Sequence, residues 1–297
     1  MSAAPYFPIE AGPHRLTMGL AQLKDKPWFE VGHDVAADLD EKDRLLKTHR
    51  DKVVATVPGS VDGQQEVLDL MTPYLTERYP DRYRQDGDMM HIGGLAAPRN
   101  LNDPDRAPLE TAARLVQEDL CLMEPNDGQY ILTAALVCFP TRWSLAQKIG
   151  RPLGPIHAPV PGYEAELDHS MEAYFQRIQP GKPTWRINWS LVEDPALYLP
   201  RKRPPIEDPI TADNIGDRLW LRTERQTLAR MPKTGGVLFT IRIHRTSLRE
   251  AIAPAGHAQR MLDAIEAMPE AMRRYKGIDR HYAALVGYLG RRVPCEL

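Results

Sequence analysis

Residues 120–139 read LCLMEPNDGQYILTAALVCF, and this stretch predicts a β-hairpin. Residues 120–123 and 130–139 are dense in apolar and β-favouring side chains, and Pro125-Asn126-Asp127-Gly128 stands between them. An Asp-Gly pair between two such runs is the strongest short signal for a hairpin turn. An antiparallel sheet is therefore expected to include this segment.

Three later segments alternate apolar with polar residues in the period of two that is typical of strands. They are residues 184–192, 219–228 and 236–245, with Lys233-Thr234-Gly235-Gly236 as the turn between the last two. Together with the hairpin, they predict about five strands in one antiparallel sheet.

Other segments carry apolar residues at helical spacing, and a loop rich in Gly, Asn and Pro follows the first two of them. The predicted helices are residues 38–57, 64–78, 109–117, 164–178, 257–268 and 279–291. Antiparallel strands with inserted and flanking helices indicate an α+β fold, and a two-plus-three division of the strands around a helical insert is typical of a PAS-like domain. We expect a helical N-terminal region, residues 1–108, packed on a PAS-like core with C-terminal helices, residues 109–297, as one integrated domain.

Composition limits the class of protein. The 297 residues are 42% hydrophobic and carry a formal net charge of −2 without any block of Lys or Arg, which argues against a nucleic-acid partner. No segment has the roughly 18 consecutive apolar residues of a membrane span, and residues 1–10 lack the pattern of a secretion signal, so we expect a cytoplasmic protein. Cys121, Cys138 and Cys295 show no CxxC spacing, which predicts reduced thiols and no cysteine-ligated metal site.

Residues 150–163 read GRPLGPIHAPVPGY and place one histidine, His157, among four prolines. Proline fixes its own φ and restricts the residue before it, so we expect a rigid loop with little helical freedom. Imidazole is a common ligand of iron and zinc, and a rigid ligand loses less entropy on binding. A lone histidine beside apolar residues is more often a hydrogen-bonded structural residue, so the spacing alone leaves both interpretations open.

The segment 219–228 is unusually polar at its centre for a strand. Alternation separates two sets of side chains, Thr223, Arg225 and Thr227 on one face and Arg222, Glu224 and Gln226 on the other. Either one face points donors and a charge into a ligand cavity, or the sheet is half-solvated and held by cross-strand ion pairs, for example to Arg242.

Several arginines lie on segments that are expected to wall one cavity, where a guanidinium can bind a carboxylate in a bidentate manner. They are Arg142, Arg151, Arg186, Arg225 and Arg242. The sequence has no GxSxG, Walker, HExxH or strand-linked GxGxxG motif, so the common hydrolase, nucleotide-binding and zinc-enzyme classes are not indicated.

Six sequence segments, taken together and in this order, resemble the haem-dependent oxidative N-demethylase α-subunit-like family, long catalogued as a domain of unknown function. They are residues 14–20, 115–123, 137–145, 156–163, 185–191 and 219–228. The resemblance runs from about His14 to Leu289.

The resemblance implies a PAS-like fold that binds b-type haem. It also implies oxygen-dependent removal of a methyl group from a small secondary amine such as dimethylamine, giving a primary amine and formaldehyde. Electrons would come from separate flavin and iron–sulfur reductase subunits, because this chain has no flavin, nicotinamide or cysteine-cluster motif. Tetrahydrofolate is implied as a possible formaldehyde acceptor. A non-catalytic haem- or ligand-binding sensor of the same fold is the alternative.

The resemblance also suggests roles for residues. His157 is the expected axial iron ligand, because it is the histidine within one of the segments that resemble the family, residues 156–163. His244 is a second candidate, and it stands where we expect an aromatic residue such as tyrosine in relatives.

Further roles follow for the residues around the iron. Arg142, Arg225 and Arg242 are expected to contact haem propionates or to lie just behind those contacts. Glu224, Tyr163 and Trp143 are expected near the amine or the iron-bound oxygen, because an alkylammonium ion suits a carboxylate or an aromatic face.

Overall fold

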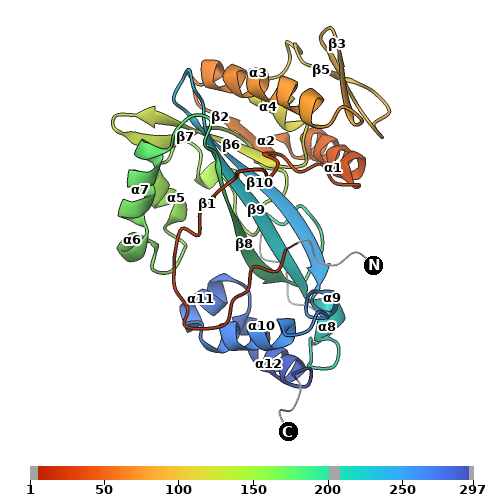
Figure 1. Ribbon diagram of the computed structural model, residues 1–297, viewed down its shortest axis with the longest axis vertical. Coiled ribbons are helices and arrows are strands. Elements are labelled where there is room, and N and C mark those ends of the chain that lie inside the picture. The colour runs from red at the N-terminus through yellow and green to blue at the C-terminus, as the bar shows by residue number, and fades with distance from the viewer. Residues whose placement is uncertain (1–5, 201–207, 294–297) are drawn as a thin grey trace.

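The computed structural model describes residues 6–200 and 208–293. Cys295 and residues 1–5 lie outside these ranges. The α+β fold has a seven-stranded antiparallel sheet, a smaller three-stranded sheet and helices around them (Figure 1). Across the two described ranges, no helix combines the length and the apolar character that crossing a bilayer requires.

The predicted hairpin is confirmed. Strand β6 (Asp119–Asn126) pairs with β7 (Gln129–Leu136), and only Asp127 and Gly128 form the turn. Their φ angles are 47° and 82°, so both residues are left-handed, as a two-residue turn between twisted strands requires.

The other three predicted strands are also confirmed. They are β8 (Thr184–Val192), β9 (Trp220–Arg230) and β10 (Val237–Ser247). Strand β10 pairs with β9 on one side and with β6 on the other, so it joins the hairpin to the three later strands. The sheet order is β1-β8-β9-β10-β6-β7-β2.

Two strands of this sheet come from the N-terminal region, for which helices and loops but no strands were predicted. Strand β1 (Ala21–Gln22) pairs with β8, and β2 (Val54–Thr56) pairs with β7. The helix predicted over residues 38–57 was wrong at its end, because β-branched residues at 53, 54 and 56 favour pairing with an available strand edge. Part of the expected Gly-, Asn- and Pro-rich loop forms the small sheet of β3 (Tyr83–Asp86), β4 (Met89–Ile92) and β5 (Arg99–Asn100).

The N-terminal helices cover part of one face of the main sheet, beside the small sheet (Figure 1). They are α1 (Val35–Thr48), α2 (Arg50–Val53), α3 (Val61–Arg78) and α4 (Pro108–Ala113). The second and third predicted helices are thus present, with the third shorter than expected. Their apolar stripes enclose the largest core cluster, which includes Leu39, Met71 and Leu120.

The segment between β7 and β8 forms a short 3₁₀ turn and three short helices. They are η1 (Leu145–Gln147), α5 (Leu153–His157), α6 (Tyr163–Glu166) and α7 (Asp168–Arg177). The prediction of a rigid loop with little helical freedom around His157 was wrong in part, because His157 is the last residue of the short helix α5. Pro155 is tolerated there because it lies in the first turn of α5, where the backbone N–H has no helical partner to lose.

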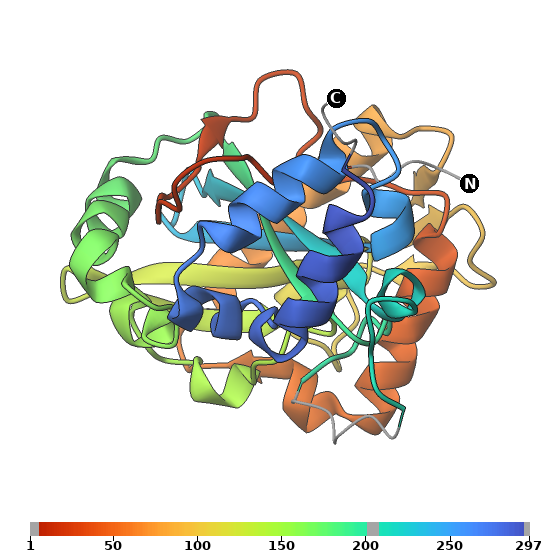
Figure 2. The same cartoon turned by 90° about the horizontal axis from the view of Figure 1, so that it is seen from below.

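The C-terminal helices pack on a separate apolar cluster at the end of the long strands, which includes Leu191, Leu221 and Leu285. Figure 2 shows them lying across that end of the sheet. The elements of this part are α8 (Ile215–Arg218), α9 (Leu248–Ala251), α10 (His257–Glu266), α11 (Glu270–Tyr275), η2 (Asp279–His281) and α12 (Tyr282–Gly290).

Candidate functional site

One face of β8 and β9 carries a strip of half-buried polar side chains. The strand register places Arg186 opposite Gln226 and Asn188 opposite Glu224. Since residues two apart on a strand share a face and directly opposed residues are neighbours, these four side chains lie together. We call them the polar strip.

The carboxylate of Glu224 is the centre of the polar strip. It accepts hydrogen bonds from the hydroxyl of Thr141 at 2.6 Å, from Nε2 of Gln226 at 2.8 Å and from Nδ2 of Asn188 at 3.3 Å. The Thr141 hydroxyl accepts in turn from Nε of the fully buried Arg222 at 2.9 Å. Three donors therefore hold this acceptor in one orientation.

Two cations lie beside Glu224. Arg186 makes no hydrogen bond or ion pair with any described residue, although its Nε is buried. Lys276, which follows α11, donates to the carbonyl of Trp189 at 2.8 Å and to Oδ1 of Asn188 at 3.3 Å. Burial, followed by the charge of Arg186, lowers the pKa of Lys276 to about 8. Arg186 is thus a half-buried cation that can bind an anion.

His157 is presented by α5 in a defined protonation state. Its Nδ1 lies 2.9 Å from the carbonyl oxygen of Leu153, one helical turn earlier. A carbonyl can only accept, so Nδ1 carries the proton and Nε2 carries the lone pair. Burial lowers the pKa of His157 to about 4, and the charges of Lys148 and Arg186 act in the same direction. The ring is therefore neutral near pH 7 and offers Nε2 as a ligand atom.

Tyr163 and Asp168 stand next to His157. The Tyr163 ring stacks on the imidazole with centroids 4.7 Å apart, and its hydroxyl is buried without a hydrogen-bond partner among the described residues. Asp168 Oδ1 is in the same situation, as is Nε2 of His14 near Lys276. A buried polar group without a partner costs about 1–3 kcal/mol, so these atoms mark a place where a ligand can supply the missing hydrogen bonds.

Electrostatic coupling ties these groups into one region. The charges of Arg186 and Asp168 both act on His157, and the charge of Glu224 acts on Arg186 and on Lys276. The region bounded by α5, α6, the start of α7, the polar strip and the residue after α11 is the candidate site.

Arg225 lies on the opposite face of the sheet from the polar strip, since it is one residue away from Glu224. Its Nε lies 3.1 Å from the Glu30 carboxylate, and its guanidinium also donates to the carbonyls of Pro27 and Trp28. His244 binds the same carboxylate through Nε2 at 2.9 Å. The structure therefore does not bring Arg225 or His244 together with His157.

Arg242 lies directly across from Arg225 in the strand register. It binds Asp38 at 2.8 Å and Asp34 at 3.1 Å, so its ion pairs go to α1 and the residue before it, not to a neighbouring strand. Arg225 and Arg242 thus hold the N-terminal segment on the sheet, and the single cavity expected to collect all the arginines does not form.

Arg142 has a left-handed backbone, with φ 60°, which is uncommon for a residue other than glycine. Its guanidinium pairs with Glu193, which also accepts from Nε2 of His281 at 3.2 Å. Burial opposes ionisation of Glu193, but the His281 hydrogen bond and the Arg142 charge outweigh it and lower the pKa to about 2. Arg142 is therefore engaged in an ion pair near the C-terminal helices.

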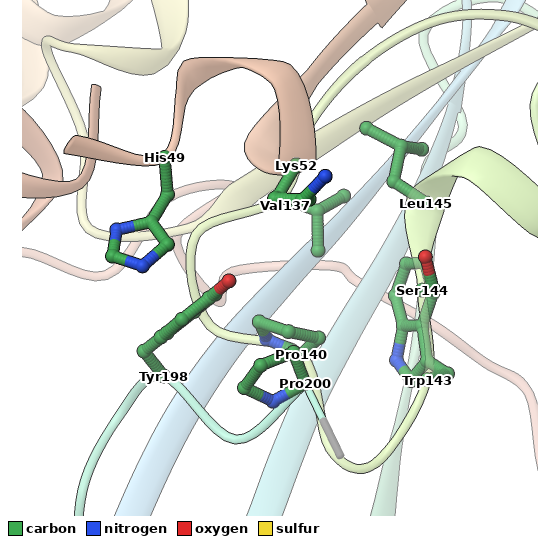
Figure 3. Close-up of a pocket in the computed structure, with 9 residues that line it drawn as sticks. All are labelled: His49, Lys52, Val137, Pro140, Trp143, Ser144, Leu145, Tyr198 and Pro200. Carbon is green, nitrogen blue, oxygen red and sulfur yellow. The ribbon is translucent and has the colours of Figure 1, made fainter. Parts of the chain in front are cut away.

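Trp143 lines a separate cavity of about 320 Å³, together with residues that include His49 and Tyr198 (Figure 3). Its ring also faces Nζ of Lys148 at 5.3 Å, and that amine donates to the carbonyl of Ile156, next to His157. Trp143 thus stands between this cavity and the candidate site.

Residues 19–286 match the profile of a family described as haem-dependent oxidative N-demethylase, alpha subunit-like. The chain belongs to this family. The matched range of this N-demethylase α-subunit-like chain includes His157, Arg186, Glu224 and Lys276, whereas His14 lies before it.

The site residues of this N-demethylase α-subunit-like chain fit the cofactor in the family name. Haem iron takes an axial imidazole through one nitrogen, and Nε2 of His157 has the lone pair and the neutral state for that bond. Haem propionates need cationic or hydrogen-bonding partners. The buried Nε of Arg186 has no hydrogen-bond partner among the described residues, so it is available to a propionate.

Sequence reasoning missed part of the site. The sequence did not distinguish Arg186 from the other four candidate arginines. No sequence pattern indicated Lys276 or Asp168. The alternation of residues 184–192 does put Arg186 and Asn188 on one face, but only the register with β9 shows that this face is the one with Glu224.

Proposed function

We propose that this protein is a haem-binding oxygenase subunit that removes a methyl group from a small secondary amine such as dimethylamine, giving a primary amine and formaldehyde. The family membership supports the haem-dependent N-demethylase class. The observation that carries the proposal within the structure is the state of His157, whose Nδ1–H is bound to the Leu153 carbonyl while Nε2 makes no hydrogen bond with a described residue.

In this proposal His157 is the axial ligand through Nε2. When bound, haem supplies oxygen activation and one-electron redox chemistry, and the protein supplies the ligand, the charges and the shape. Arg186 takes a propionate, because it lies on the same side of the sheet and no described residue pairs with it. Lys276 lies next to Arg186 and adds positive charge for the same purpose.

Glu224 is the proposed group that binds the protonated amine. Its carboxylate is oriented by Thr141, Asn188 and Gln226, so a bound ammonium ion meets a fixed acceptor. Fixing the nitrogen in this way also orients the N-methyl group. Holding a reacting group in the correct geometry lowers the entropic part of the activation barrier. Tyr163 and Trp143 are the aromatic groups proposed to shape the substrate space, since cations favour aromatic faces.

The strand order supports the PAS-like interpretation. Five neighbouring strands of the larger sheet form two groups, the hairpin β6–β7 and the three later strands β8, β9 and β10. Strand β6 pairs with β10, and α5, α6 and α7 lie between the two groups in the chain. This is the two-plus-three division expected of a PAS-like core. Electrons are proposed to come from a separate reductase, in keeping with a family named for an α subunit.

The test is spectroscopic and chemical. The purified protein loaded with haem is reduced chemically or with a reductase under oxygen, and formaldehyde release from dimethylamine is measured. We expect a Soret band that shifts on amine addition and formaldehyde formation that depends on the amine. Tight haem binding without amine-dependent oxygen uptake would contradict the enzyme and favour a non-catalytic haem sensor, and a colourless protein after reconstitution would contradict both.

A further inference from the structure

Asp168 is the first residue of α7, and its carboxylate lies against α5, the helix that presents His157. Gly154 makes this approach possible, because a Cβ atom at this position would stand 3.1 Å from Asp168 Oδ1. That oxygen is buried and has no hydrogen-bond partner among the described residues. The start of a ten-residue helix favours a negative charge, so the helix dipole helps to keep the carboxylate there.

The negative charge of Asp168 reaches the imidazole. It raises the pKa of His157, against the larger effects of burial and against the positive charges of Lys148 and Arg186. Glu172, one turn further along α7, acts on Tyr163, as Asp168 does, whereas among the main causes of the His157 shift the only carboxylate is Asp168. The two carboxylates of the same helix therefore differ in what they influence.

We propose that Asp168 is a positioning residue that tunes His157 as an iron ligand, supplying the negative charge that favours the oxidised iron over the reduced iron. This inference rests on the proposed function. An unpaired carboxylate packed on the helix that presents a ligating imidazole stabilises additional positive charge at the metal, and surroundings of low dielectric strengthen the effect. Lys148 and Arg186 act on the imidazole in the opposite direction to Asp168.

The experiment compares Asp168→Asn with Glu172→Gln in the haem-loaded protein. The midpoint potential of the ferric–ferrous couple is measured by spectroelectrochemical titration, with the Soret band recorded in each state. We expect Asp168→Asn to shift the equilibrium about tenfold toward reduced iron, a rise of about 60 mV for a one-electron couple. Glu172→Gln is the matched control, and we expect it to leave the potential near that of the parent protein.

Gly154→Ala provides a second variant that keeps the carboxylate. The added methyl group forces the Asp168 carboxylate to move by a few tenths of an ångström. We expect a smaller change in potential that disappears when Gly154→Ala is combined with Asp168→Asn. Such non-additivity is the signature of two changes that act through one group.

The outcomes separate this inference from the proposed function. If His157→Ala removes the haem spectrum while Asp168→Asn and Glu172→Gln have equal potentials, the role of Asp168 is overturned and haem ligation by His157 stands. If the protein binds no haem, or if its spectrum is unchanged by His157→Ala, the proposed ligation itself fails and the tuning role falls with it.

Discussion

The imidazole of His157 lies nearly parallel to the phenol ring of Tyr163, with centroids 4.7 Å apart and an interplanar angle of 17°. Stacking fixes the plane of the ring, and the hydrogen bond from Nδ1 to the Leu153 carbonyl fixes its rotation within that plane. The direction of the Nε2 lone pair is thus set by the protein itself.

Replacing His157 with alanine removes the proposed axial ligand. We expect the affinity for haem to fall by at least roughly a hundredfold, because even the loss of groups that support a ligand costs 10–100-fold. The measurement is titration of the protein with haem, followed at the Soret band, and added imidazole should restore the band in this variant. His169→Ala is the matched control, since His169 is exposed on α7. An unchanged titration for His157→Ala would rule out this ligand and turn attention to His244.

Replacing Arg186 with glutamine removes the unpaired cation of the polar strip. A hydrogen bond to a charged group is worth about 1.5–3 kcal/mol, so we expect haem binding to weaken by roughly tenfold or more. The effect should be larger at low salt than at high salt, since part of it is electrostatic. Arg177→Gln is the control, because Arg177 is exposed at the end of α7. Equal affinities for both variants would show that Arg186 does not bind a propionate.

Replacing Glu224 with glutamine removes the proposed ammonium acceptor but keeps the side-chain volume. We expect KM for dimethylamine to rise by roughly tenfold, as the loss of a charge-assisted hydrogen bond requires, while the Soret band stays unchanged. The steady-state rate of formaldehyde release gives KM and kcat separately. Glu164→Gln, at an exposed position on α6, should behave like the parent. A variant that binds haem more weakly but has an unchanged KM once it is saturated with haem would assign Glu224 to the cofactor.

Replacing Asp38 with alanine breaks the ion pair with Arg242, in which both residues are at least 96% buried. Removing Asp38 leaves the buried Arg242 with only the more exposed Asp34 as an ionic partner, so we expect the free energy of unfolding to fall by up to about 3–5 kcal/mol. Urea denaturation followed by circular dichroism measures the change. Glu41→Ala breaks a more exposed pair with Arg44 on the same helix and should cost no more than about 1 kcal/mol. Equal losses would mean that the Arg242 contact contributes little.

Acid should weaken the contact of Glu193 with Arg142 and His281. The pKa of Glu193 is about 2 in the fold, below its ordinary value of 4.5, so its contribution to stability is present above pH 4.5 and is lost as the pH falls toward 2. Denaturant unfolding at several pH values would show this slope. In Glu193→Gln the slope between pH 4.5 and 2 should be smaller than in the parent, and identical slopes would show that other carboxylates dominate acid unfolding.

The sequence by itself determined the local elements. Residues 120–139, with their Asp-Gly turn, specified β6 and β7 because the pattern and the turn geometry act over a few residues. The period-two segments specified β8, β9 and β10 for the same reason. His157 could be singled out from the sequence because it lies among four prolines. These signals are short-range, so each could be read without knowing what packs against it.

The tertiary structure alone decided what each face of the sheet does. Alternation separated Glu224 from Arg225, but it could not show that α5 to α7 and the residue after α11 stand on the side of Glu224 while Glu30 neutralises Arg225 on the other. The unpaired state of Arg186 and the room that Gly154 leaves for Asp168 likewise depend on segments that are distant or on opposite sides of a turn. The physical reason is that charge pairing and burial are set by long-range packing, whereas hydrophobic period and turn chemistry are properties of neighbouring residues.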